Sequence, residues 1–306
     1  MKIIPVASDS MGVRSMATLV VAGKTVFIDP SAALGPVRYG LPPSEQEIEM
    51  LRLSIDRIVE LSGRADPIFI THYHYDHHPH PDRRELYEKL FSGKTVVALD
   101  YRNLHASGRE RGRRFEIAAR EYARELVFTE GEEFKFGSLK VETKCAWHGE
   151  VGSRVGKVLM LFFRSGKKSY LFGSDAQNLS DPGAREWFEE KRPDIATIDG
   201  YPTTFIGWRF SKKRFEESKV MLAGTLERSG CRTVILEHHL LRDLRYREKI
   251  PELLRGFGVK TAAEYLGLEN LFLEALRKKI SDGEISPDVR AYDLSLRSLI
   301  RKALRA

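Results

Sequence analysis

The stretch "IFITHYHYDHHPH", residues 68–80, holds five of the nine histidines of the chain. The apolar letters at its start indicate a buried strand, and His72 and His74, two residues apart in extended chain, leave that strand on the same face. A turn toward the following proline then brings Asp76 and His77 to the same small volume. Imidazoles combined with a carboxylate suit divalent metals that take nitrogen and oxygen ligands. The stretch therefore predicts half of a metal site, with the other half elsewhere in the chain.

The segment His72-Tyr73-His74-Tyr75-Asp76-His77 resembles the HxHxDH signature of the metallo-β-lactamase fold superfamily. The other motifs of that superfamily occur in the expected order: Asp29 in "VFIDP", His148 in "KCAWHGE", Asp175 in "YLFGSD", and His238 or His239 in "VILEHH". Together the motifs run from residue 29 to residue 239. With "SDSMGVRSMAT" near the start and "EHHLLRD" near the end, the pattern is most similar to an archaeal branch of predicted metal-dependent hydrolases.

The resemblance implies an α/β fold, a four-layer αββα sandwich with the site at one edge of its two sheets. It also implies two divalent metal ions, zinc in most members, with manganese or iron as alternatives. The ligands carried over are His72, His74 and His148 for the first metal, Asp76, His77 and His238 (or His239) for the second, Asp175 between the two, and Asp29 behind the histidine loop. His238 is preferred to His239 because the family's last histidine commonly follows the strand at this spacing.

The chemistry that follows is hydrolysis without a protein nucleophile. A pair of metals about 3.5–4 Å apart lowers the pKa of a bound water toward ~7 and polarises the substrate. Asp76 and His238 are the expected catalytic residues, with Asp76 orienting the water or accepting its proton. The iron-dependent redox branch of the superfamily typically has Glu where this chain has His74. The sequence therefore argues against a redox function.

The composition fits one domain, residues 1–306, with a core of about 1–245 and a helical extension of about 246–306. Hydrophobic residues make up 42% and charged residues 30% of the chain, as in a globular protein. No apolar run reaches the roughly 20 residues that cross a membrane, and no signal peptide is recognised, so a cytoplasmic location is expected. Only Cys145 and Cys231 occur, which excludes a cysteine-rich zinc module.

The net charge of +7 and a pI near 9.3 leave two explanations open. One is an anionic partner, with a phosphodiester or nucleic acid as the first substrate class. The other is a thermophilic protein with surface ion-pair networks, which the two glutamines and three asparagines also fit. A thioester, lactone or other small metabolite is the alternative substrate, and a non-catalytic RNA-binding protein on the same fold is the alternative function. The sequence does not indicate an oligomeric state.

A few further residues are candidates for contacts around the site. Arg14 and Ser15 precede the first predicted hairpin, where Arg14 could bind an anionic group. Arg242 and Asp243 could form an ion pair that orients His238. The basic segment 109–114 is either a lid over an acidic substrate or, as we favour, a solvated helix face.

The periodicity predicts the following elements: a hairpin at 16–30, helices at 44–63, 81–93, 102–125, 180–191 and 211–229, strands at 67–72, 95–100, 194–200 and 232–239, hairpins at 134–145 and 157–175, and helices after about residue 245.

Overall fold

The computed structural model describes residues 1–305 and contains two β-sheets packed face to face. The first sheet has the order β1 (Lys2–Pro5), β2 (Thr18–Ala22), β3 (Lys24–Ile28), β4 (Ile68–Ile70), β5 (Thr95–Leu99), β6 (Glu125–Thr129). The second has the order β13 (Val259–Lys260), β12 (Thr233–Glu237), β11 (Ile195–Asp199), β10 (Lys168–Phe172), β9 (Lys157–Ser165), β8 (Leu139–Trp147), β7 (Glu133–Phe136).

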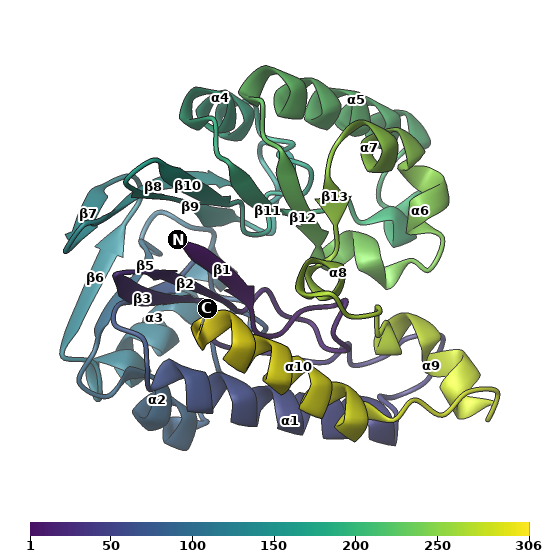
Figure 1. Ribbon diagram of the computed structural model, residues 1–306, viewed down its shortest axis with the longest axis horizontal. Helices are drawn as coiled ribbons and strands as arrows, with labels where there is room; N and C mark the ends of the chain where they lie inside the picture. Colours follow the sequence, from purple (N-terminus) through teal and green to yellow (C-terminus); the bar gives the residue numbers. More distant parts are fainter. Residues whose placement is uncertain (306) are drawn as a thin grey trace.

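Helices cover the outer face of each sheet, which completes the four layers that the sequence predicted (Figure 1). On the first sheet lie α1 (Glu45–Ser62), α2 (Arg84–Phe91), α3 (Ala106–Arg120) and α10 (Val289–Arg305), and on the second α4 (Pro182–Lys191) and α5 (Lys212–Ser229). The remaining helices are α6 (Tyr246–Lys249), α7 (Pro251–Gly256), α8 (Ala262–Leu266), α9 (Leu273–Ser281) and the short 3₁₀ helices η1 (Thr203–Phe205) and η2 (His238–Arg242). None of the helices in residues 1–305 has the length and apolar character to span a membrane.

The central strands are buried on both faces, which explains their nearly continuous apolar sequences. All three residues of β4 and six consecutive residues of β9 are buried. Phe69 of the first sheet packs edge-on against Phe163 and Phe134 of the second, with ring centroids 6.3 and 6.0 Å apart. Such aromatic contacts hold the two sheets in a fixed relation, so the loops at their common edge are held in place as well.

The predicted helical segment after residue 245 is only partly helical. Val259–Lys260 form β13, which adds a parallel edge strand to β12, and α10 packs against α1. Two buried ion pairs connect this segment to α1: Arg57 contacts Asp293, and Arg277 contacts Glu47 at 2.8 Å. The C-terminal segment thus contributes to the second sheet and also covers the helical layer of the first. Strands β1 and β6 are further elements that the sequence did not predict.

Candidate metal centre

The candidate ligands all follow the carboxyl ends of strands, at one edge of the sandwich. His72, His74, Asp76 and His77 follow β4, Asp175 follows β10, His148 follows β8, and His238 follows β12. A turn closes the histidine loop, since the backbone N–H groups of His77 and His78 donate to the carbonyl of His74 at 3.0 and 3.2 Å. This turn brings the second half of the motif back toward the first, as the sequence predicted.

One group of four side chains has the composition of a nitrogen-rich metal site. His72, His74, His148 and Asp175 each place one ligand atom within 4.8 Å of the others. His148 Nε2 is 3.2 Å from Asp175 Oδ2, and His72 Nε2 is 3.6 Å from the same oxygen. Three imidazoles around one carboxylate suit zinc or a similar divalent ion.

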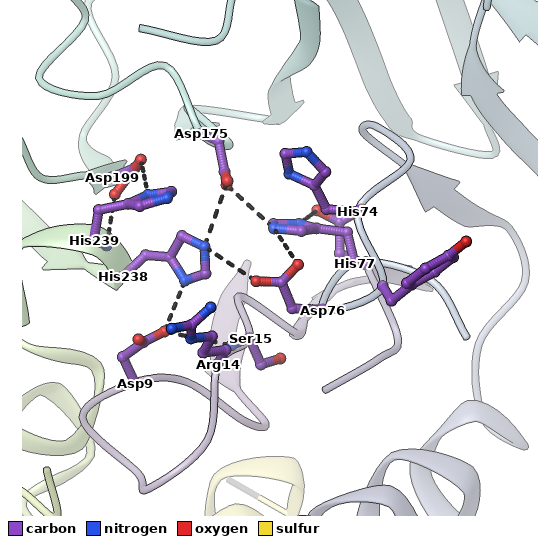
Figure 2. A network of polar contacts seen from close by, with 12 residues as sticks. Asp9, Arg14, Ser15, His74, Asp76, His77, Asp175, Asp199, His238 and His239 are labelled. Atoms are coloured by element: carbon purple, nitrogen blue, oxygen red, sulfur yellow. Dashed lines mark hydrogen bonds and ion pairs between the residues drawn. The ribbon is translucent and has the colours of Figure 1, made fainter. Parts of the chain in front are cut away.

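A second group lies beside the first and consists of Asp76, His77 and His238. Asp175, a member of the first group, also contacts the second (Figure 2): its Oδ1 is 3.2 Å from His77 Nε2 and its Oδ2 is 3.4 Å from His238 Nε2. Asp175 thus contacts ligand-type atoms of both groups. The structure thus brings together all seven ligands expected from the sequence.

The unsatisfied atoms of the site fit a bound cation. His77 Nε2, His148 Nε2 and both oxygens of Asp175 are buried without a hydrogen-bond partner among residues 1–305. Buried polar atoms of this kind are normally paired, because an unpaired one costs about 1–3 kcal/mol. A metal ion among these atoms would satisfy them, so the residues present fit the divalent ions that the superfamily implies.

The electrostatics of the site divide the histidines into two kinds. Burial, together with the neighbouring His148, lowers the pKa of His74 to about 4, and burial also lowers the pKa of His72 well below its ordinary value. Their neutral rings are the form that binds metal. Burial opposes charge on His238 too, but the carboxylates of Asp175 and Asp9 outweigh it and raise the pKa of His238 to about 10. A metal ion at the second group would therefore displace a proton from His238.

Asp29 holds the histidine loop from behind. Its carboxylate accepts hydrogen bonds from His77 Nδ1 at 2.8 Å, from the Thr71 backbone N–H at 2.8 Å and from the Thr71 hydroxyl at 2.7 Å. The bond to Nδ1 leaves His77 Nε2 directed at Asp175, which is how a carboxylate outside the ligand set orients a metal-binding histidine. This is the position that the sequence predicted for Asp29.

His238 and His239 lie on different sides of the site, each held by an aspartate. Asp9 Oδ2 is 2.7 Å from His238 Nδ1, and Asp199 Oδ2 is 2.8 Å from His239 Nδ1. His238 belongs to the group with Asp76 and His77. His239 belongs only to a third group, in which it lies near Asp175 and His238. This geometry favours His238 as the ligand of the second ion, with His239 at the wall of the adjoining cavity.

Several site residues adopt left-handed backbone conformations. The φ angles are 48° at Asp29, 47° at Ser174 and 67° at His238, values that residues other than glycine rarely adopt. Gly200 lets the chain after β11 pass close to Leu240 of η2, because a Cβ at residue 200 would be only 2.3 Å from Leu240 Cβ. Such strained and crowded positions are typical of functional sites.

Asp9 is the residue around the site that sequence reasoning missed. It follows β1, is 3.0 Å from Arg242 Nε and binds His238, so Arg242 pairs with Asp9 and not with Asp243 as expected. Asp243 instead contacts Lys249 and the Thr203 hydroxyl. The only signal was a polar "SDS" directly after an apolar strand, and the pairing with Arg242 spans 233 residues.

The expected substrate contacts of Arg14 and Ser15 do not match the structure. Arg14 forms two hydrogen bonds with Glu274, at 2.6 and 2.7 Å, and its guanidinium therefore fixes the C-terminal segment. Ser15 is buried, and its hydroxyl donates to the carbonyl of Ser31. Both polar groups are committed to structural contacts, which leaves Arg242 as the arginine beside the ligands.

The basic segment 109–114 lies on the exposed face of α3, as favoured from the sequence. Arg113 pairs with Glu110 at 3.0 Å and Arg114 with Asp82 at 2.9 Å. These ion pairs neutralise two of its charges locally.

A cavity of about 360 Å³ opens beside the ligands. His74, His148, His239 and Arg242 line its inner end, and residues of the loop 150–155 and of the segment 202–210 line the rest. Its volume falls in the range of sites for small molecules. The ligands can thus be reached from solvent through a defined pocket.

The architecture places the chain in a known fold class. It superposes on a possible metal-dependent hydrolase from Veillonella parvula with a TM-score of 0.51 and 11% identity, covering 85% of this chain and 94% of the other. It also superposes on the Zn²⁺-bound PqqB from Methylobacterium extorquens with a TM-score of 0.53 and 11% identity, covering 89% and 99%. The chain has the metallo-β-lactamase fold.

Sequence relatives identify the family. The chain is 36% identical over 299 residues to a UPF0282 protein of Pyrococcus furiosus, covering 94% of each. It is 37% identical over 295 residues to that of Methanopyrus kandleri, covering 93% of this chain and all of the relative. It belongs to the UPF0282 family of archaeal proteins. No protein-family model matches the sequence.

Proposed function

We propose that the chain is a metal-dependent hydrolase with a dinuclear site, zinc being the first metal to test, that acts on an anionic substrate. The observation that carries the proposal is the pair of ligand groups that both contact Asp175, with four buried ligand-type atoms that face one another but make no hydrogen bond. Phosphodiesters, including nucleic acid, are the first substrate class. An intact ligand set argues against the alternative of a non-catalytic RNA-binding protein.

The two ions, when bound, would polarise the substrate and lower the pKa of a bound water. The protein residues supply the rest. Asp76, whose Oδ2 is 3.5 Å from His238 Nε2, would orient a water and accept its proton through its carboxylate. Asp29 and Asp9 fix the rings of His77 and His238 through their Nδ1 atoms. The ligands are thus held in place before any substrate arrives.

An anionic substrate is supported by the charges beside the ligands. Arg242 lines the cavity, 3.2 Å from His238 Nε2 and 3.9 Å from Asp76 Oδ2. Arg209 also lines the cavity, while the acidic residue there, Glu150, is paired with Arg214 at 2.9 Å. Because Arg242 pairs with Asp9, Arg209 is the charged side chain of the lining that has no ion-pair partner among residues 1–305. The modest size of the cavity favours the second candidate, hydrolysis of a thioester, lactone or other small metabolite.

Metal content and phosphodiesterase activity test the proposal together. We expect purified protein to hold about two zinc or similar ions per chain and to hydrolyse bis-(p-nitrophenyl) phosphate. His72→Ala should lower the metal content and reduce the rate by about 100-fold or more, since losing only an outer partner of a metal ligand typically costs about 10- to 100-fold. The matched control is His105→Ala, which removes an exposed histidine outside the site and should change neither.

Two outcomes decide between the candidates. Turnover of acyl substrates with no turnover of phosphodiesters would select the small-metabolite hydrolase. A folded protein that binds no divalent metal at all would refute the dinuclear hydrolase in either form.

A further inference from the structure

The outer end of the cavity beside the metal centre is aromatic. Phe205 and Phe210 line it, and Trp208 packs against Phe205 with ring centroids 5.7 Å apart. Trp208 is 72% exposed, the second most exposed large apolar side chain among the residues described. An indole in this position contributes little to folding, because most of its surface stays in water. Trp208 does not itself line the cavity but packs beside Phe205 and Arg209, which do, so it offers an exposed apolar surface next to the cavity.

Arg209 adds an uncommitted positive charge to the same aromatic group. Its guanidinium carbon lies 4.5 Å from the centre of the Trp208 ring and 5.5 Å from that of Phe205. The guanidinium has no ion-pair or hydrogen-bond partner within residues 1–305. A guanidinium stacked on indole extends the flat surface and retains its charge for an anion.

The aromatic group and the candidate ligands belong to one continuous cavity. Its lining includes His74 and His148 of the first ligand group, Gln177 and Arg242, and the aromatic Phe205 and Phe210. Val151 and Val155 of the β8–β9 loop line it as well and are 61% and 51% exposed. A molecule bound along this lining would meet ligand atoms at one end and flat aromatic groups at the other.

We propose that the cavity binds a nucleotide unit, with the base on Phe205, Trp208 and Arg209 and the phosphate at the metal centre. Aromatic rings and arginine planes are the groups on which proteins stack bases without regard to sequence, whereas an aliphatic chain would need no such flat surface. The inference deepens the proposed function, on which it rests, by assigning the substrate class to nucleotides and short single strands.

Equilibrium binding of two small probes separates the base from the phosphate. Adenosine monophosphate and ribose 5-phosphate share a phosphorylated ribose and differ in the base. Stacking of one base is worth roughly 5- to 150-fold in affinity. For the metal-loaded wild-type protein we therefore expect calorimetry to give a Kd at least about 10-fold lower for adenosine monophosphate than for ribose 5-phosphate. In Trp208→Ala that ratio should fall below about 3-fold, with the Kd of ribose 5-phosphate unchanged.

Three controls make the result specific. Trp208→Phe keeps a flat ring and should keep most of the ratio, while losing the change in tryptophan fluorescence that accompanies binding. Val220→Ala alters another exposed apolar residue, on α5 and outside the cavity lining, and should change nothing. Unchanged melting temperatures would show that each variant is folded.

The outcomes distinguish this inference from the proposed function. Equal affinities of the wild type for both probes, or a ratio that Trp208→Ala leaves intact, would overturn the assignment of nucleotides even if phosphodiesters are hydrolysed. Absence of metal and of any hydrolysis would overturn the proposed function itself.

Discussion

The imidazole of His78 is buried among aromatic rings and takes no part in the candidate metal site. It lies 5.2 Å from the Phe115 ring and 5.9 Å from the Tyr73 ring, and its Nδ1 is 3.1 Å from the Tyr87 hydroxyl. Burial lowers the pKa of His78 to about 3. The histidine next to a metal ligand in the sequence is thus a neutral core residue.

The low pKa of His78 predicts a pH-dependent loss of stability. The unfolded chain takes up the proton near the ordinary pKa of about 6.5, while the folded chain does not, so folding is disfavoured increasingly as the pH falls below that value. Between pH 6.5 and 5 this histidine should reduce the free energy of unfolding by about 2 kcal/mol. His78→Phe removes the titration and leaves the Tyr87 hydroxyl its bond to the Pro79 carbonyl.

Denaturant unfolding at several pH values measures the effect. The free energy of unfolding of His78→Phe should fall less steeply than that of the wild type below pH 6.5. His80→Phe, at a partly exposed histidine of the same loop, is the control. Parallel curves for His78→Phe and the wild type would contradict the prediction.

At the scale of elements, the C-terminal segment is attached to α1 by buried charge. Arg277 of α9 donates to both carboxylate oxygens of Glu47, at 2.9 and 2.8 Å, and to the carbonyls of Leu41 and Gly35. Glu47 also closes the N-terminal capping box of α1. One arginine therefore connects α9 both to the start of α1 and to the loop that precedes α1.

Arg277→Met should destabilise the fold strongly, because it leaves the buried carboxylate of Glu47 without its partner. The expected loss is roughly 3–5 kcal/mol in the free energy of unfolding, measured in urea. Arg277→Met combined with Glu47→Gln should lose less than the single variant, since the glutamine carries no charge and can still accept the capping bond. A double variant less stable than Arg277→Met would contradict this explanation.

The elements also show what the sequence could predict. The histidine loop and the strand before each motif were predicted because their signals are local: an apolar run, then a ligand-type residue. Strand β13 escaped prediction because two residues carry no periodicity, and Asp9 because its partners lie more than 220 residues away. The ion pair of Arg14 with Glu274 was also not predicted, because the two residues lie far apart in the sequence and no local pattern connects them.

At the scale of the whole molecule, the candidate metal centre joins the two sheets. The histidine loop extends from the first sheet, and His148, Asp175 and His238 extend from the second. Ions bound between them would hold the two halves of the sandwich together. Because the assembled site exists only in the folded state, metal binding should favour folding by mass action.

Metal removal should therefore lower the melting temperature. Zinc at about 100 times its dissociation constant would stabilise the fold by about 2.7 kcal/mol, and a chelator should reverse the effect. The gain on adding zinc should be smaller in His238→Ala than in His239→Ala if His238 is the ligand, and the gain in His105→Ala should match the wild type. Equal melting temperatures with and without metal would contradict a site between the sheets.

The left-handed backbone conformations at Asp29, Ser174 and His238 affect which substitutions these positions can accept. A non-glycine residue in such a conformation stores of order 1–3 kcal/mol, and glycine would relieve it. At Asp29 and His238, however, glycine would also remove the hydrogen bonds that the side chain makes with Thr71 and His77 or with Asp9. The strain at these positions is thus tied to contacts of the candidate metal centre, and relieving it by mutation would take those contacts away.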